Sequence, residues 1–259
     1  MCRFAAYLGV PTSLGHFLLE PDHSLYHQAF EPRELRYTKL NADGFGFGWY
    51  GEEDEPLLYT NPAPIWTDPN LPSLARGLTS DLWVAHVRSA TRGNPVSHAN
   101  TQPFKDEELL FNHNGFIEDF HEQVMPAIAG ELEPAFFADV LGNTESEYLF
   151  AWLRQILSED AELPIDQALR ELLKRLDDLL DGNRALLNML VTEGERLYAV
   201  RHAAGDDCPS LYFTTDDELF PEAQLIASEC LTESGIWHPV PSHQLLIIDP
   251  EEPPELIDL

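Results

Sequence analysis

The sequence predicts an α+β fold in which helices pack on the outside of two β-sheets. The order of the elements supports this class: strand-like runs come first, helical patterns follow, and further strand-like runs fill the last third of the chain. This blockwise order fits two sheets with external helices better than one alternating parallel sheet. The chain of 259 residues shows no internal repeat and no linker long enough to separate domains, so we expect residues 1–259 to form a single domain.

The first half of the chain contains strand-like runs joined by loops. Residues 1–9 predict a first strand, and residues 22–35 a short helix or loop. Glycines alternate with aromatic residues over 41–50, which predicts a strand that another backbone approaches closely. A phosphate-binding loop is the alternative there, but no helical pattern follows and the surrounding charge is negative. Residues 52–72 are acidic and rich in proline, and they predict an irregular connection.

Two apolar runs predict core strands, at residues 81–88 and 109–113. Residues 89–105, between them, are rich in Gly, Pro, Asn and Ser, which is typical of a loop. Loops at the ends of core strands carry a large share of catalytic and binding residues. We therefore expect a functional site near these strand ends.

Helical signals dominate the middle of the chain. Residues 118–130 predict a helix, and the Thr-Glu-Ser-Glu segment at 144–147 predicts a capping box at the start of another. Residues 164–181 repeat leucine at helical spacing and end before Gly182, which predicts an amphipathic helix. Later strand-like runs occur at 185–192, 196–201, 211–214, 224–228 and 244–249. The acidic tail, residues 250–259, predicts a loose end.

The charge of the chain excludes two classes of partner. Asp and Glu number 45 against 15 Lys and Arg, which gives a formal net charge of −30. A field of this sign repels nucleic acid and anionic membranes, so we expect neither as a partner. The sequence shows no signal peptide and no apolar run of membrane-spanning length, which predicts a cytoplasmic protein. The acid excess with scarce lysine also suggests a salt-adapted source, and maximal stability without added salt would contradict that hypothesis.

The cysteines and histidines do not predict a metal site. Cys2, Cys208 and Cys230 form neither a CxxC pair nor an even set, so we expect no disulfide framework and no zinc site. The histidines lack the spacing of metal ligands, and His86 and His113 are expected to pack near strand ends. We therefore expect no metal and no cofactor.

Cys2 has a property that an internal cysteine lacks. Removal of Met1 exposes the α-amino group of Cys2 beside its own thiol. The pKa of such an amine is about 7.7–8.0, so a good fraction is neutral at physiological pH and can take the thiol proton. The thiolate can then attack a carbonyl carbon. A chance Met-Cys start is the alternative, and this signal alone does not decide between them.

Acyl transfer from an amide also requires donors for an oxyanion and charged groups that hold the substrate. Arg88 follows a core strand, where its guanidinium suits a carboxylate. Asn114 and Gly115 end the next strand and offer a side-chain amide and a backbone N–H to an oxyanion. Glu145, in the first turn of a helix, suits an ammonium group, with plain helix capping as an equal alternative.

Together these motifs resemble the class II glutamine amidotransferase domain of the N-terminal-nucleophile hydrolase superfamily. The motifs occur in the family's order: the Met-Cys start, segment 41–49, His86-Val-Arg-Ser-Ala-Thr91, Asn100-Thr-Gln-Pro-Phe104, His113-Asn-Gly115 and segment 144–147. The resemblance covers nearly the whole chain. It implies a four-layer αββα sandwich, with two antiparallel sheets between helices.

The resemblance implies a role for each matching residue. Cys2 would be the nucleophile with its α-amine as base, and Asn114 and Gly115 would form the oxyanion hole. Arg88 and Thr91 would bind the carboxylate end of a γ-glutamyl group. Glu145 would bind the α-ammonium group; the family usually has Asp there, so the geometry is expected to differ.

A stand-alone subset of the family is similar in three further stretches: the MCRF start, EPDHSLYHQAF from Glu20, and IASECLTES from Ile226. This subset includes the ergothioneine-pathway enzyme that removes γ-glutamate from a hercynylcysteine sulfoxide conjugate. Ser89 and Arg92 replace the Trp and His of some synthase members, which implies a different pocket edge. The chain is expected to end where the glutaminase module ends, without an ammonia-acceptor domain. The resemblance therefore implies hydrolysis of a small-molecule γ-glutamyl amide.

Two alternative functions stay open from the sequence. A glutaminase subunit would deliver ammonia to a separate synthase subunit and would co-purify with it. A catalytically silent γ-glutamyl-binding protein would keep Met1, and Glu145 in place of Asp is the feature that favours it. The sequence carries no signal for the oligomeric state.

Overall fold

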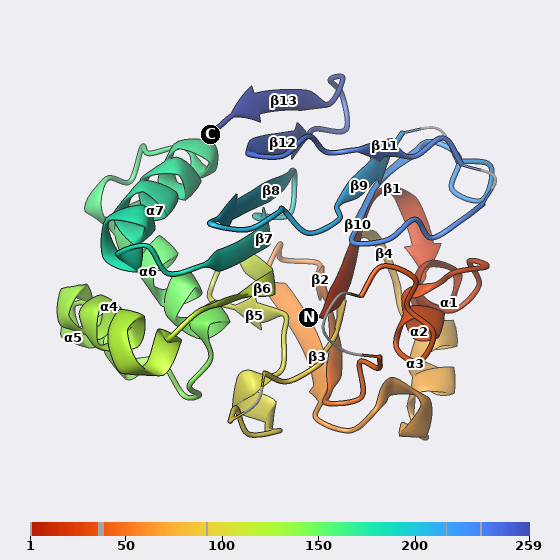
Figure 1. The fold of residues 1–259 in the computed structure, drawn as a ribbon. Coiled ribbons are helices and arrows are strands. Elements are labelled where there is room, and N and C mark those ends of the chain that lie inside the picture. Colours follow the sequence, from red (N-terminus) through yellow and green to blue (C-terminus); the bar gives the residue numbers. More distant parts are fainter. Residues whose placement is uncertain (1, 36–38, 92, 216, 234) are drawn as a thin grey trace.

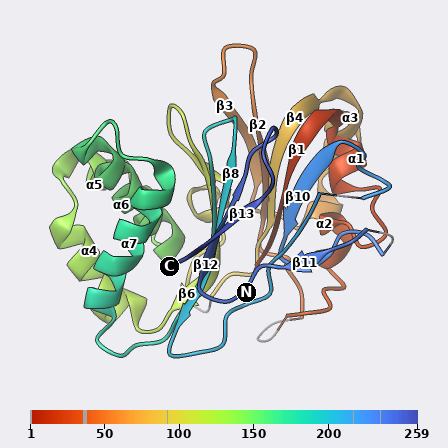
Figure 2. The same cartoon turned by 90° about the horizontal axis from the view of Figure 1, so that it is seen from above.

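The computed structural model of the protein describes residues 2–35, 39–91, 93–215, 217–233 and 235–259. Met1 and Arg92, which bear on the predictions about processing and the pocket edge, lie outside these ranges. The described chain forms four layers, in which two antiparallel sheets lie face to face between two groups of helices (Figure 1, Figure 2). The predicted α+β class and αββα layer order are confirmed.

The first sheet carries the N-terminal strand in its middle. Its strand order within the described residues is β11-β9-β10-β1-β4-β2-β3. Its strands are β1 (Arg3–Ser13), β2 (Phe45–Tyr50), β3 (Pro56–Asn61), β4 (Thr79–Val87), β9 (Tyr212–Thr214), β10 (Ala223–Ala227) and β11 (His238–Pro239). Because β1 is paired on both sides, by β10 and β4, the backbone that follows Cys2 is held within the sheet.

The second sheet has the order β13-β12-β8-β7-β6-β5 among the described residues. Its strands are β5 (Phe104–Lys105), β6 (Leu110–Ile117), β7 (Ala185–Thr192), β8 (Leu197–Ala204), β12 (Gln244–Ile248) and β13 (Glu255–Asp258). The prediction of a loose tail is wrong, because β13 pairs antiparallel with β12. The edge of β12 offers backbone donors and acceptors that the tail satisfies despite its acidic composition.

Helices cover the outer face of each sheet (Figure 2). The first sheet is covered by α1 (Leu14–Leu18), α2 (Leu25–Gln28) and α3 (Leu71–Gly77). The second is covered by α4 (Met125–Glu131), α5 (Pro134–Ala138), α6 (Glu145–Glu159) and α7 (Ile165–Leu180). Shorter helical turns are η1 (Ile65–Thr67), η2 (His98–Asn100) and η3 (Phe120–Val124). In the described ranges, no helix combines the length and apolar character needed to cross a bilayer.

Clusters of apolar side chains fill the three spaces between the four layers of helices and sheets. The strand alternation of β4 illustrates the arrangement: Trp83 and Ala85 pack toward α1–α3, whereas Leu82 and Val84 pack between the sheets. A third cluster lies between the second sheet and its helices, and it contains the buried leucines of α7 that the helical spacing predicts. The amphipathic helix is therefore confirmed, with its apolar face against the second sheet.

Two further predictions of local structure need correction. Residues 52–72 are not an irregular connection, because β3, η1 and the start of α3 lie in them. The short Leu-Leu-Tyr run of β3 is flanked by acidic residues and prolines, so its sequence does not indicate a strand, although it pairs with β2. The second correction concerns β6, which continues to Ile117, so Asn114 and Gly115 lie inside a strand rather than at its end. The close backbone approach predicted for 41–50 is confirmed at Gly46, where a Cβ would lie 2.4 Å from the carbonyl oxygen of Gln102.

Candidate active site

One narrow pocket brings together most of the residues predicted for the site. Its empty volume is about 320 Å³, and Cys2, Arg88, Thr91, Gly115 and Glu145 all line it. They come from the start of β1, the loop after β4, the middle of β6 and the first residue of α6. The remaining lining residues are Ser89, Ala90, Asn94, Asn100, Gln102, His113, Thr144 and Ser146.

The thiol of Cys2 is buried against the loop that follows β4. The backbone N–H of Ser89 donates to Cys2 Sγ at 3.4 Å, and Sγ lies 3.6 Å from the carbonyl oxygen of Ser89. Burial raises the pKa of the Cys2 thiol, and the Ser89 N–H and the Arg88 charge oppose that rise. A thiol with a raised pKa stays protonated at neutral pH, so this nucleophile needs a base at hand.

Arg88 and Glu145 form a pair of opposite buried charges in the pocket. Their exposed fractions are 3% and 6%. Burial lowers the pKa of Arg88, and the charges of Cys2, Asp43 and Glu145 oppose this shift. Burial raises the pKa of Glu145, and its own backbone N–H and the Arg88 charge oppose it. A buried positive group and a buried negative group that line the same pocket are complementary to the carboxylate and ammonium of an amino acid.

Backbone carbonyl groups fix the guanidinium of Arg88. Its Nη1 donates to the carbonyl oxygens of Asp43 at 3.3 Å and Pro95 at 3.2 Å. The carboxylate of Asp43 in turn accepts a hydrogen bond from the N–H of Ala90 at 2.9 Å. Asp43 therefore makes a tertiary contact in addition to its place in the chain before Gly44. It ties the loop after β4 to the segment before β2, a tertiary contact that no local pattern shows.

Asn114 is not among the residues that line the pocket. It is fully buried, and its Nδ2 donates to Ser228 Oγ at 3.4 Å. The same hydroxyl accepts from the N–H of Phe4 at 3.1 Å. Alternation along β6 places Asn114 on the inter-sheet face, where Leu110 and Phe4 also pack. One hydrogen of its amide group is thus engaged, and the amide has a second hydrogen to donate.

Gly115 is required by packing against the neighbouring strand. A Cβ at this position would lie 1.7 Å from the carbonyl oxygen of Leu186. The role that the sequence predicts for Gly115, a backbone N–H for an oxyanion, does not include this constraint from β7. Only glycine allows β6 and β7 to approach so closely while this backbone borders the pocket.

His113, the residue before Asn114, is held in place by hydrogen bonds to three residues. Gln102 accepts from the N–H of His113 at 2.6 Å and donates to its carbonyl oxygen at 3.0 Å. The ring of His113 contacts Ser146 Oγ through Nδ1 at 2.9 Å and the Leu186 carbonyl oxygen through Nε2 at 3.1 Å. Because a carbonyl oxygen only accepts, Nε2 carries the proton and Nδ1 accepts from Ser146. These contacts explain Gln102 in the Asn-Thr-Gln-Pro-Phe motif.

His86 and His113 are buried, and both are neutral at physiological pH. Burial lowers the pKa of His113 to about 4 and that of His86, with a contribution from Arg88, to about 3. His86 lies one residue before the end of β4, as predicted, whereas His113 lies in the middle of β6 because that strand continues to Ile117. No group of three His, Cys, Asp or Glu side chains within the described ranges is arranged to hold a metal ion.

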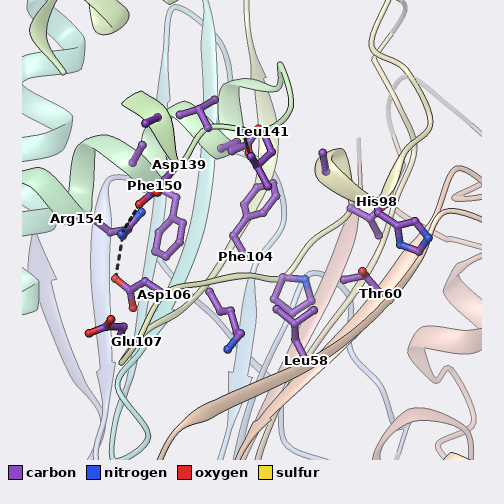
Figure 3. Close-up of a pocket in the computed structure, with 18 residues that line it drawn as sticks. Leu58, Thr60, His98, Phe104, Asp106, Glu107, Asp139, Leu141, Phe150 and Arg154 are labelled. Carbon is purple, nitrogen blue, oxygen red and sulfur yellow. Dashed lines mark hydrogen bonds and ion pairs between the residues drawn. The ribbon is translucent and has the colours of Figure 1, made fainter. Parts of the chain in front are cut away.

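A larger groove lies elsewhere on the molecule and contains none of the predicted site residues. Figure 3 shows this groove, which has an empty volume of about 1180 Å³ and is bordered by β3, β5 and α6. Arg154 forms ion pairs with Asp106 and Asp139 along its wall, each at 3.0 Å. The groove presents neither a nucleophile nor an oxyanion donor arrangement, so size does not identify the active site here.

Comparisons with known proteins identify the family to which the sequence is similar. A family model described as glutamine amidotransferases class-II matches residues 17–226. The probable glutamine amidotransferase DUG3 of Saccharomyces cerevisiae is 31% identical, over 96% of this chain and 82% of the relative. The gamma-glutamyl-hercynylcysteine sulfoxide hydrolase of Mycolicibacterium smegmatis is 28% identical, over 95% of both chains.

Solved structures of similar proteins share the fold. A glutamine aminotransferase class-II domain protein from Silicibacter pomeroyi has a TM-score of 0.73 and 26% identity, with 99% of both chains covered. The glutamine phosphoribosylpyrophosphate amidotransferase of B. subtilis has a TM-score of 0.67 at 14% identity, over 99% of this chain and 49% of that one, and therefore supports the fold alone. Because the family model spans most of the sequence, the chain belongs to the class II glutamine amidotransferase family and is an amidohydrolase.

Proposed function

We propose that the protein hydrolyses the γ-glutamyl amide bond of a small-molecule conjugate through a thioester on Cys2. The observation that carries this proposal is the convergence of Cys2, Arg88, Gly115 and Glu145 on one narrow pocket. The similarity to a gamma-glutamyl-hercynylcysteine sulfoxide hydrolase supports a conjugate of that type as the substrate. In this proposal residues 1–259 act as one catalytic domain, after Met1 has been removed.

The charged pair in the pocket orients the glutamyl group. Arg88, with Thr91 beside it, binds the α-carboxylate, and Glu145 binds the α-ammonium. Each substrate charge meets a buried partner of opposite sign, so binding offsets part of the cost of burying Arg88 and Glu145. The γ-carbonyl then points away from this pair, toward Cys2.

The chemistry proceeds by attack, acylation and hydrolysis. The α-amine of Cys2 takes the thiol proton, and Sγ attacks the γ-carbonyl carbon. The Asn114 amide and the Gly115 N–H stabilise the resulting oxyanion. The protonated amine passes its proton to the leaving nitrogen as the C–N bond breaks. Water, deprotonated by the same amine, attacks the thioester; the C–S bond breaks, the sulfur regains a proton and glutamate leaves.

The nucleophile can be tested directly on the processed protein. Intact-mass measurement before and after 6-diazo-5-oxo-norleucine should show loss of Met1 and one adduct on Cys2. Cys2→Ala should lower hydrolysis of γ-glutamyl amides by at least about 10⁴-fold. Cys230→Ala is the matched control, because this half-buried thiol lies outside the pocket lining and should leave activity unchanged. Undiminished hydrolysis by Cys2→Ala, or retained Met1 in active protein, would refute the proposal.

A second function, glutaminase supply of ammonia to a separate synthase subunit, is favoured by the similarity to a probable glutamine amidotransferase. The two functions differ in the leaving group, which is a larger amine in one and ammonia in the other. We expect a higher kcat/KM for γ-glutamyl conjugates than for free glutamine. A preference for glutamine, together with a co-purifying partner that accepts ammonia, would favour the second function instead. Binding of glutamate by the Cys2→Ala variant without turnover by the wild type would indicate a silent binding protein.

A further inference from the structure

A buried ion pair lies on the helix-covered side of the nucleophile strand, opposite the pocket. Arg3 Nε contacts Glu229 Oε1 at 2.5 Å, and the two side chains are 0% and 1% exposed. Arg3 begins β1, and Glu229 follows β10. The register Ala5↔Ala227 continues through the hydrogen bond from Ser228 N to the Phe4 carbonyl oxygen, 2.9 Å, so Arg3 and Glu229 face each other across the two strands.

The carboxylate of Glu229 is the centre of this network. Besides Arg3, it accepts from His23 Nε2 at 2.8 Å, from the N–H of Arg33 at 2.8 Å and from the N–H of Glu34 at 2.9 Å. Burial acts to raise the pKa of Glu229, but His23, Arg3 and the two backbone N–H groups lower it to about 2. The carboxylate is therefore ionised throughout the physiological pH range. Removing its charge would leave several buried donors without an anionic partner.

Arg3 connects this network to the nucleophile. Its Nη1 donates to the carbonyl oxygen of Cys2 at 3.0 Å. Strand pairing with β4 begins at Arg3, so the residue before it is outside the ladder. In the processed chain Cys2 is the first residue, and its thiol is held by the Ser89 contacts described above. The carbonyl contact fixes the plane of the Cys2–Arg3 peptide. Because Ser89 also holds the thiol, rotation about the Cα–C bond of Cys2 is restricted, and this sets the direction of the amine.

From this geometry we infer that Arg3 and Glu229 are positioning residues for Cys2. Glu229 holds the guanidinium of Arg3, and Arg3 holds the Cys2 carbonyl group so that the α-amine and thiol face each other and the pocket. The inference rests on the proposed function, because it concerns the base and nucleophile of that reaction. Neither residue lines the pocket.

The same network joins the three stretches that resemble the stand-alone subset. Arg3 belongs to the MCRF start, His23 to the stretch from Glu20, and Glu229 to the stretch from Ile226. Gln28, also in the second stretch, donates to the carbonyl oxygens of His23 at 2.9 Å and Glu229 at 3.3 Å. Segments more than 190 residues apart in sequence therefore converge on one carboxylate behind the nucleophile.

The test compares Glu229→Gln with wild type after Met1 removal has been verified by intact mass. The amide keeps the shape but loses the charge and turns a donor toward other donors. We expect kcat for a γ-glutamyl amide to fall roughly 10- to 100-fold with KM nearly unchanged, because misplacement of a catalytic group acts on the chemical step. The rate of Cys2 alkylation by iodoacetamide, measured against pH, should fall in parallel.

Asp68→Asn is the matched control for loss of a buried carboxylate. Asp68 is 7% exposed and accepts from Tyr59, Asn61 and Asn70 in the layer on the same side of the first sheet. This variant should lose thermal stability while kcat and Cys2 alkylation stay at wild-type values. If Glu229→Gln behaved like this control, losing stability but keeping both rates, the positioning role would be wrong.

A second variant, Arg3→Lys, tests the inference if Glu229→Gln does not fold. Arg3→Lys keeps the positive charge beside Glu229, but a single ammonium group lacks the fork that reaches both Glu229 and the Cys2 carbonyl oxygen. It should show the same loss of kcat and of alkylation rate, and wild-type rates in folded Arg3→Lys would overturn the inference. If wild type hydrolysed no γ-glutamyl amide but both variants still slowed alkylation, the proposed function would fail and the positioning role would stand.

Discussion

The side chains that fill the space between the two sheets are apolar at one end and polar at the other. At one end, side chains from both sheets form an apolar cluster that includes Leu8, Leu82, Leu190 and Leu246, all nearly or fully buried. At the other end, the same strands β4, β6 and β7 place His86, Asn112, Asn114 and Asn188 in positions that are equally buried. The residues alternate in the same way along each strand, so only the identity of the inward side chains changes.

The difference separates what stabilises the fold from what performs the chemistry. The apolar end removes hydrocarbon from water and packs it. At the polar end, both amide atoms of Asn112 and the Oδ1 atoms of Asn114 and Asn188 have no protein hydrogen-bond partner within the described ranges. Buried polar groups without partners lower the stability of a fold, so the polar end of this layer stabilises the protein less than the apolar end does.

The largest effect on stability is expected at the apolar end. Leu190 is fully buried in the inter-sheet cluster, and Leu190→Ala should lower the free energy of unfolding by about 4 kcal/mol through lost burial and the cavity left behind. The kcat of the folded fraction should not change. Urea unfolding and steady-state kinetics measure the two quantities. Leu141→Ala is the control, because Leu141 is 80% exposed and its removal should change neither. A large loss of kcat in Leu190→Ala would show that the two ends are not independent.

The largest effect on catalysis is expected at the polar end. Asn114→Ala should lower kcat for γ-glutamyl amides about 10²- to 10³-fold, since one oxyanion donor is lost, an effect of about 3 kcal/mol on the barrier. Asn112→Ala is the matched control on the same face of the same strand, two residues away, and should leave kcat near the wild-type value. Equal losses in both variants would point to a general disturbance of β6 instead of a specific donor.

The sequence predicts the elements whose signals are local. The leucine spacing of α7 and the apolar run of β7 give the observed elements almost residue for residue. The strands β3 and β13 were missed because their acidic or proline-rich surroundings look irregular until a neighbouring strand supplies hydrogen-bond partners. Edge strands of this kind are defined by pairing more than by composition.

The residues of the site also divide into those that the sequence predicts and those that only the fold reveals. Cys2, Arg88 and Glu145 carry chemistry in their own side chains, so a sequence can suggest them, and the pocket brings them together. The supporting contacts, such as Gln102 to His113 and Arg3 to Glu229, join residues that are distant in sequence or ordinary in type. Their importance comes from burial and mutual geometry, which only the folded chain reveals. The reason for Gly115, a carbonyl group on β7, belongs to this second class.

The pH dependence of stability offers a test of the polar end. The pKa of His86 is about 3 in the folded protein, against about 6.5 in an unfolded chain. The unfolded state therefore binds more protons in this range, and stability falls as the pH drops from 6.5 toward 3. Between pH 6.5 and pH 4 this one residue should account for about 3 kcal/mol. His86→Leu should flatten the measured curve by that amount, and an unchanged slope would mean that His86 stays solvated.

The smallest expected effect is a gain in stability from removing an unpartnered group. Asn112→Leu replaces a buried amide without a described protein partner by an apolar side chain of similar size. We expect the free energy of unfolding to rise by about 1 kcal/mol, measured by urea titration, because the desolvation cost of the amide disappears. Asn188→Leu should not gain, since Asn188 Nδ2 donates to the Ser210 carbonyl oxygen at 2.9 Å and that acceptor would lose its donor. A loss of stability in Asn112→Leu would show that this amide is solvated by bound water, and the polar end would then cost the fold less than its count of unpartnered atoms implies.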